Sequence, residues 1–160
     1  MVGVIEVAVV LVVDGGHLLL LQTAAGHVGE GKWKGLSGKL LPGERPSEGA
    51  AREAFEESGL SVSRLVRHGV IRCCFGGREN PDWIVYVFST DSFEGDMRPS
   101  PEGVLKWFPL EEIPYGEMWE DNRHWLPLVL GGKRFKCEFQ YNEEGSKLLD
   151  FSLDIEDLRA

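Results

Sequence analysis

The chain has 160 residues, of which 42% are hydrophobic and 27% charged, and its formal net charge at pH 7 is −9. Those proportions are ordinary for a globular protein, and the length suits one core, so we expect residues 1–160 to form a single domain. The acidic excess argues against a broad surface for nucleic acid polymers or for an anionic membrane. It does not exclude nucleotides, because a bound metal ion can reverse the local field.

The cysteines give little sign of a disulfide framework. Cys73, Cys74 and Cys137 are odd in number and form no C-x-x-C motif, so neither disulfides nor a zinc site are expected. Reduced cysteines in a cytoplasmic protein are the simpler interpretation. The apolar residues 7–13 are too few to cross a membrane and follow no basic segment, so we expect no membrane partner.

The first part of the chain indicates a hairpin and a loop. Residues 4–13 and 17–22 are rich in apolar side chains and are separated by Asp14-Gly15-Gly16, which predicts two strands joined by a tight turn. The glycine-rich residues 23–32 are typical of a surface loop. Residues 33–41 are interrupted by glycines and predict short extended backbone.

A helix is predicted after the turn at Pro42-Gly43. Pro46 suits the first turn of that helix, and Gly59 is placed to end it. Small and apolar residues between them recur at helical spacing, which predicts an apolar stripe along the helix. The members of the stripe are Ala50, Ala51, Ala54 and Phe55.

Two further strands are predicted at residues 63–74 and 82–88, around a turn at residues 76–81. Both faces of the segment 82–88 are apolar, so we expect it to be covered on both sides. Residues 91–104 are polar and rich in Pro and Gly, which predicts a loop, and residues 105–109 predict a short strand.

A second helix is predicted from near Arg123 to the Gly131-Gly132 pair. Pro127 is tolerated only near the first turn of a helix, which favours a late start. Residues 133–141 and 147–153 predict a final hairpin. Together the elements predict an α/β fold with a mixed β-sheet sandwiched between α-helices.

The first predicted helix carries an unusual set of acids. Glu53, Glu56 and Glu57 stand at i, i+3 and i+4, which places three like charges on one helical face. A hard divalent cation such as Mg²⁺ would relieve their repulsion, because it prefers oxygen ligands and often shares them with a substrate phosphate. The alternative is an ordinary solvated acidic helix, which explains neither Gly38 nor the position of Arg52.

These acids belong to a longer motif that resembles the Nudix box. A chance match to its seven fixed identities is on the order of one in 10⁸ per starting position. The resemblance implies the Nudix fold and hydrolysis of a nucleoside diphosphate linked to another group. The matching residues are Gly38, Glu44, Arg52, Glu53, Ala54, Glu56, Glu57, Gly59 and Leu60.

The resemblance also implies roles for residues around the motif. Glu53, Glu56 and Glu57 are expected to hold Mg²⁺, with Mn²⁺ as a possible substitute, and Glu102 matches a further carboxylate from a downstream loop. Gly38 is expected to let the backbone approach the metal closely, although a β-bulge is an alternative reason for a glycine there. The identity of the general base among the four glutamates stays open.

Arg52 is a cation directly beside the cluster of glutamates on the predicted helix. We expect it to pair with Glu44 and to brace the loop against the helix. A contact with a substrate phosphate is the competing role.

Other segments are similar to the MutT-like branch of the family, which acts on oxidised purine nucleoside triphosphates. Residues 31–39, 118–130 and 135–151 carry this likeness. It implies hydrolysis of substrates such as 8-oxo-dGTP to the monophosphate and pyrophosphate, by a monomer or homodimer that cleans the nucleotide pool. The alternatives are a general (d)NTP pyrophosphatase, another Nudix diphosphatase, or a non-catalytic nucleotide sensor.

The same likeness implies a base-binding site. Trp119 matches a tryptophan that stacks on the purine, with core or hairpin packing as the alternative, and Asp121 matches the first of two adjacent aspartates. Asn122 replaces the second aspartate. Because an amide is always neutral and offers donors and an acceptor, we predict that base recognition survives with an altered purine preference and a weaker dependence on pH.

Other substrate contacts depart from the branch. Lys34 stands where the branch has an asparagine that contacts the base. A lysine can donate but cannot accept, so a contact with a substrate phosphate is the alternative role. Val28 stands where the branch has an aromatic pocket residue. Lys39, beside Gly38, is a further candidate for a substrate contact.

Overall fold

The computed structural model describes residues 3–157. Within that span the chain forms helices α1 (Pro46–Ser58) and α2 (Asn122–Leu130) and the short 3₁₀ segments η1 (Leu110–Glu112) and η2 (Tyr115–Glu117). In chain order, the strands are β1 (Ile5–Asp14), β2 (His17–Thr23), β3 (Trp33–Lys34), β4 (Leu36–Lys39), β5 (Ser61–Ser63), β6 (Val66–Phe75), β7 (Trp83–Thr90), β8 (Ser92–Glu94), β9 (Gly103–Pro109), β10 (Lys133–Tyr141) and β11 (Leu148–Asp157).

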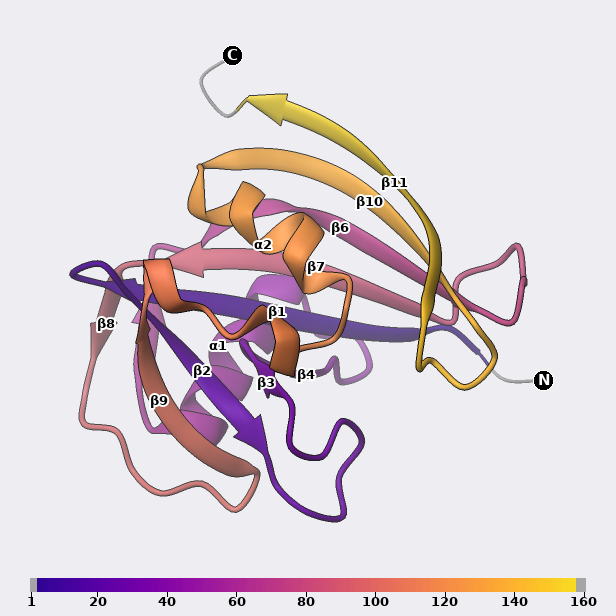
Figure 1. Cartoon of the computed structure of the whole chain (residues 1–160). Coiled ribbons are helices and arrows are strands. Elements are labelled where there is room, and N and C mark those ends of the chain that lie inside the picture. The colour runs from indigo at the N-terminus through magenta and orange to yellow at the C-terminus, as the bar shows by residue number, and fades with distance from the viewer. Residues whose placement is uncertain (1–2, 158–160) are drawn as a thin grey trace.

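The main sheet is mixed, as the sequence predicted. Its strand order is β11-β10-β6-β7-β1-β2-β3, with β4 paired to β1 and β9 paired to β2 (Figure 1). β1 runs parallel to β7, and β10 runs parallel to β6, whereas the other pairs in this sheet are antiparallel. The pairing of β4 with β1 places Gly38 opposite Ala8, at the start of the acidic motif.

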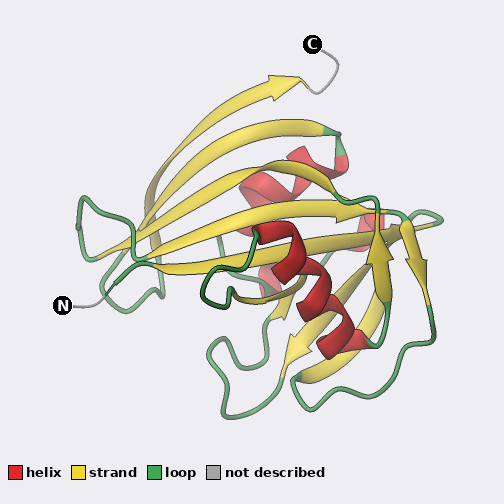
Figure 2. Ribbon diagram, turned by 180° about the vertical axis from the view of Figure 1, so that it is seen from behind, coloured by secondary structure: helices red, strands yellow, loops and turns green. Residues whose placement is uncertain are grey.

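The two helices cover opposite faces of the sheet, which confirms the predicted sandwich. Figure 2 shows α1 in front of the sheet, and α2 lies on the side facing the viewer of Figure 1. Alternate residues of β1 supply the two cores, because successive side chains of a strand point to opposite faces. The core on the α1 side contains Ala8, Val10, Val12, Leu36, Ala50 and Ala54.

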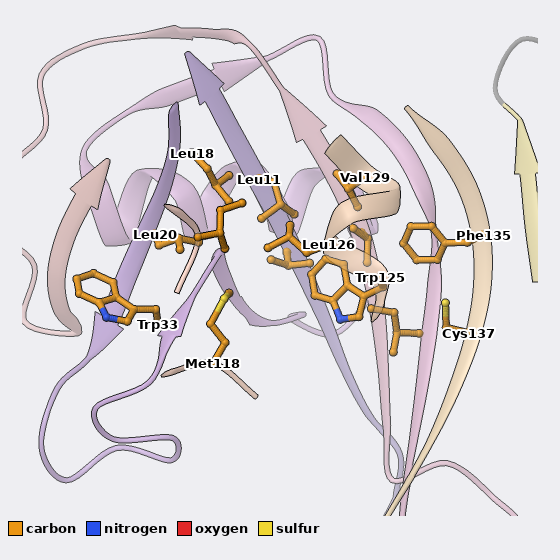
Figure 3. Packing of buried hydrophobic residues seen from close by; sticks show 14 of the residues in the cluster. Leu11, Leu18, Leu20, Trp33, Met118, Trp125, Leu126, Val129, Phe135 and Cys137 are labelled. Atoms are coloured by element: carbon orange, nitrogen blue, oxygen red, sulfur yellow. The ribbon is translucent and has the colours of Figure 1, made fainter. Parts of the chain in front are cut away.

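The core on the α2 side is larger and more aromatic. Trp125 and Leu126 of α2 pack towards Leu11 of β1, with Phe135 and Trp33 at its margins (Figure 3). Strand β7 contributes to both cores, so the prediction of a strand covered on both sides is confirmed. Neither helix of residues 3–157 is long and apolar enough to cross a bilayer.

Helix α1 forms where its local signals predict it. Pro46 lies in the first turn, and the backbone N–H of Arg45 donates to the Glu48 carboxylate at 3.2 Å. Gly59 ends the helix with a φ of 84°, and its N–H donates to the Phe55 carbonyl at 2.8 Å. This left-handed backbone conformation favours glycine, because glycine has no Cβ that would clash with the neighbouring backbone.

Helix α2 corrects the expectation about Pro127. The helix begins at Asn122, so Pro127 lies in its interior and not in its first turn. Proline has no backbone N–H, so the carbonyl of Arg123 lacks its usual helical donor. Arg123 is exposed to solvent. Burial of Trp125 and Leu126 in the core offsets the lost hydrogen bond.

Two other predicted boundaries were wrong. The segment 63–74 is divided, because Arg64 adopts a φ of 52° between β5 and β6. The segment 91–104 is not entirely loop, because β8 pairs with β5 in a separate small sheet and β9 already begins at Gly103. Three-residue strands are too short to show an alternating pattern in the sequence.

Candidate active site

The acidic motif folds so that α1 lies directly against β4. A Cβ added to Gly38 would overlap the carboxylate of Glu53, so this glycine leaves the space that the Glu53 side chain fills. The glycine is thus required for close packing of strand and helix at this point. Glu53 is largely buried, and this burial raises its pKa, although the neighbouring Arg52 guanidinium opposes the shift.

Arg52 braces the loop against the helix as predicted from its position. Its Nε and Nη2 donate to the two oxygens of Glu44 at 2.8 and 2.9 Å. These bonds and the N–H of Leu41 lower the pKa of Glu44 to about 2. The remaining guanidinium nitrogen, Nη1, donates to Glu53 at 2.8 Å and contacts the more exposed Glu56 at 3.2 Å.

Glu57 is the most deeply buried carboxylate of the motif, with a side chain only 4% exposed. Its Oε1 accepts the backbone N–H of Ser37 at 2.8 Å, and its Oε2 accepts the Lys34 ammonium at 3.0 Å. Burial raises the pKa of Glu57, and the Lys34 charge opposes that shift. No local pattern in the sequence indicates this pair, because Lys34 and Glu57 are 23 residues apart on different elements.

The donor set of the acidic motif fits a hard cation. Glu53 and Glu57 supply oxygen atoms from one face of α1, and both carboxylates are already paired with positive side chains. In the part of the chain that the structure describes, no three acidic, histidine or cysteine side chains are gathered into a ready metal cage. A cation would therefore compete with the Lys34 ammonium for Glu57, whereas the Arg52 guanidinium beside Glu53 is anchored on Glu44.

Glu102 lies on the loop beside the glycine-rich segment. Its carboxylate is 3.7 Å from Nδ1 of His27 and is about half exposed, and its backbone carbonyl accepts the N–H of Ala24 at 2.9 Å. These contacts tie Glu102 to the glycine-rich loop and not to the carboxylates of α1. Its role as a metal ligand stays a prediction, and His27 is a neighbour that the sequence did not reveal.

Trp119 borders a surface cavity with a volume of about 570 Å³. The Lys32 ammonium lies 5.2 Å from the centre of the indole ring, within the range of a cation–π contact. Gly29 packs so closely that an added Cβ would be 3.1 Å from the indole nitrogen. The cavity is lined by Lys32, Gly116, Met118, Trp119, Glu120, Arg123, Tyr141, Glu144, Gly145 and Ser146.

Asp121 is held by two neutral donors. Trp125 Nε1 donates to its Oδ2 at 2.8 Å, and the Tyr141 hydroxyl donates to its Oδ1. Burial raises the pKa of Asp121, while these two hydrogen bonds oppose the shift. The sequence analysis missed both partners; only the i, i+4 spacing of Asp121 and Trp125 could have indicated one of them.

The remaining predicted substrate contacts differ in their surroundings. Asn122 is buried, and its Nδ2 donates to the Trp119 carbonyl at 3.1 Å, so it braces the backbone of the proposed stacking residue. Val28 is 85% exposed on the glycine-rich loop. Lys39 is exposed, and its carbonyl accepts Nη2 of Arg52 at 3.0 Å. Contacts of these residues with a substrate stay predictions.

Comparison with known proteins agrees with this fold. Residues 4–129 match the NUDIX domain. The chain is 39% identical over 150 residues to an oxidized purine nucleoside triphosphate hydrolase of Danio rerio, covering 93% of this chain and 94% of that protein. It is 38% identical to the protein of the same description from Mus musculus, with 90% of each covered.

A solved structure is also similar. A MutT protein from Bacillus halodurans superimposes with a TM-score of 0.84 at 28% identity, covering 94% of this chain and 98% of that one. The chain belongs to the Nudix family, so the family prediction and the predicted fold class are confirmed.

Proposed function

We propose that this protein is a Mg²⁺-dependent hydrolase of oxidised purine nucleoside triphosphates such as 8-oxo-dGTP, which it converts to the monophosphate and pyrophosphate. The observation that carries the proposal is the packing of Glu53 and Glu57 of α1 against β4, with Gly38 leaving the space for one of them. The names of the relatives from zebrafish and mouse support the choice of substrate.

The acidic motif would hold the cation through Glu53, Glu56 and Glu57. When bound there, a divalent ion supplies charge neutralisation for the triphosphate and makes a water molecule more acidic. One carboxylate of the motif accepts the proton of the attacking water. Arg52 keeps Glu53 in position, because the same guanidinium is anchored on Glu44 by two hydrogen bonds.

The purine would lie against Trp119, with its edge towards Asp121. A stacked indole combined with hydrogen bonds in the plane of the base is an effective way to read a purine. Trp125 and Tyr141 fix the orientation of the Asp121 carboxylate, and Asn122 fixes the Trp119 backbone. Base selection therefore depends on a preorganised set of hydrogen bonds.

A kinetic screen tests the proposal. Release of pyrophosphate from oxidised and normal nucleoside triphosphates would be measured with Mg²⁺ and with Mn²⁺, and the highest kcat/KM is expected for an oxidised purine. Equal values across all triphosphates would favour a general (d)NTP pyrophosphatase instead. Tight binding without release of pyrophosphate or phosphate would overturn the enzymatic proposal and favour a nucleotide sensor.

A further inference from the structure

Lys34 has an unusual position for a residue expected to contact a base. Its ammonium donates to Glu57 at 3.0 Å, to the hydroxyl of Ser37 at 3.0 Å and to the carbonyl of Ser37 at 3.2 Å. These three contacts turn the cation inwards, and its side chain is only 28% exposed. Lys34 therefore neutralises a buried carboxylate that would otherwise be costly to keep ionised.

The two cations that pair with buried carboxylates of the acidic motif are held differently. Arg52 is fixed on Glu44 through two nitrogens of its planar guanidinium and reaches Glu53 through a third. Lys34 is a point charge on a flexible stem and makes a single contact with Glu57. It can consequently leave its carboxylate by rotating its side chain, without a shift of the backbone.

We propose that Lys34 is the resident counter-ion of Glu57: it holds the carboxylate in place when no divalent cation is bound, and it exchanges with that cation on binding. Lys34 is thus a positioning residue that sets the affinity for the metal. The inference rests on the proposed function, because it takes Glu57 as one of the ligands of the cation.

The exchange has a consequence for the nucleotide. When the cation binds, the hydrogen bond from the Ser37 N–H to Oε1 of Glu57 can remain, whereas the hydrogen bond from Lys34 to Oε2 must break. The released ammonium can keep the Ser37 hydroxyl as a partner, and it then carries a positive charge that no carboxylate neutralises and that a nucleotide phosphate could pair with. Binding of the metal and binding of the nucleotide would therefore strengthen each other.

Calorimetric titration of Mg²⁺ and Mn²⁺ into the nucleotide-free protein tests the exchange. Lys34→Met removes the competing charge, so Kd for the cation is expected to fall about tenfold, the size of one charge-assisted hydrogen bond. Lys34→Arg keeps a cation beside Glu57 and should restore a Kd near that of the parent. Lys136→Met makes the same change of charge at an exposed position of β10 and should leave Kd within about twofold.

Thermal unfolding gives a second readout. In EDTA, Lys34→Met should have a lower Tm than the parent, because Glu57 loses its counter-ion, and added Mg²⁺ should raise its Tm by more than it raises that of the parent. If Lys34→Met does not fold, Lys34→Gln serves the same purpose, since its amide can still donate to Ser37.

The outcomes separate the two proposals. An unchanged or weaker affinity of the neutral Lys34 variants for both cations overturns the exchange and leaves the metal-dependent function standing. Failure of the parent and every variant to bind either cation overturns the proposed metal site, and the exchange with it. Tighter binding by the neutral variants alone supports both.

Discussion

The proposed site has an acidic end, around Glu53 and Glu57, and an aromatic end, around Trp119 and Asp121. The two ends hold their carboxylates with partners of different charge. At the acidic end the partners are cations, since Lys34 pairs with Glu57 and Arg52 with Glu53. At the aromatic end, Asp121 accepts hydrogen bonds from the neutral side chains of Trp125 and Tyr141. A cation can be exchanged for another cation, whereas neutral donors fix an orientation without supplying charge.

This difference agrees with the tasks proposed for the two ends. Metal binding needs a carboxylate whose positive partner can be displaced, as proposed for Glu57 and Lys34, and base recognition needs a hydrogen-bond pattern that stays the same through each turnover. The following variants test whether the two ends act in this way, beginning with the largest expected effect.

Loss of a single charge at the acidic end should abolish most activity. Glu57→Gln keeps the shape of the side chain but removes the negative charge proposed to bind the cation. We expect kcat/KM for 8-oxo-dGTP to fall by more than about 10²-fold, beyond the usual effect of changing a residue that only supports a ligand. If this variant and Glu56→Gln both release pyrophosphate at the rate of the parent, the acidic end does not bind a catalytic cation.

Removal of Arg52, which braces Glu53, should reduce activity less than the loss of Glu57. Arg52→Ala frees Glu44 and leaves Glu53 without its guanidinium partner. Because Arg52 is proposed to act through Glu53, we expect a loss of about 10- to 100-fold in Mg²⁺ affinity and in kcat/KM. Arg52→Lys should recover little, since an ammonium cannot make the two parallel bonds to Glu44. Tighter Mg²⁺ binding by Arg52→Ala would show that Arg52 competes with the metal.

At the aromatic end, a change should affect binding more than turnover. Tyr141→Phe keeps the ring that stacks on Phe75 but removes the hydroxyl that donates to Asp121. That hydrogen bond opposes the rise in the Asp121 pKa caused by burial, so its loss should raise this pKa further. We expect KM for 8-oxo-dGTP to increase about tenfold with little change in kcat. A fall in kcat at constant KM would place Tyr141 in the chemistry instead.

The neutral amide at position 122 should make base binding less dependent on pH, and Asn122→Asp tests this. The new carboxyl would be buried, which raises its pKa, and once ionised it could no longer donate to the Trp119 carbonyl. Affinity of the variant for 8-oxo-dGTP should therefore decrease as the pH rises from 5 to 8, by about three- to tenfold. An equally flat profile in parent and variant would contradict the role given to the amide.

The smallest effect is expected for the contribution of Glu44 to the stability of the folded protein at low pH. Its pKa is lowered from 4.5 to about 2 in the folded protein, so its ionised form contributes stability that is present above pH 4.5 and is lost as the pH falls towards 2. The difference in Tm between the parent and Glu44→Gln should consequently be largest near neutral pH and should close between pH 4.5 and 2. A difference that stays constant over this range would show that Glu44 acts by packing and not by charge.

Much of the acidic end could be predicted from the sequence, because its determinants are local. Helical spacing places Glu53 and Glu57 on one face, and the motif positions Arg52 to reach back to Glu44 across the turn. The apolar side chains on both faces of residues 82–88 likewise predicted a strand covered on both sides.

Tertiary structure alone decided the partners that join distant segments. Three contacts connect residues at least 20 positions apart. They are the ion pair of Lys34 with Glu57, the hydrogen bond from Tyr141 to Asp121, and the small sheet of β5 and β8. Such contacts depend on strand register and on which helix covers which face, and neither is encoded in a short window of residues. Pro127 shows the converse, since burial of its neighbours overrides a strong local preference.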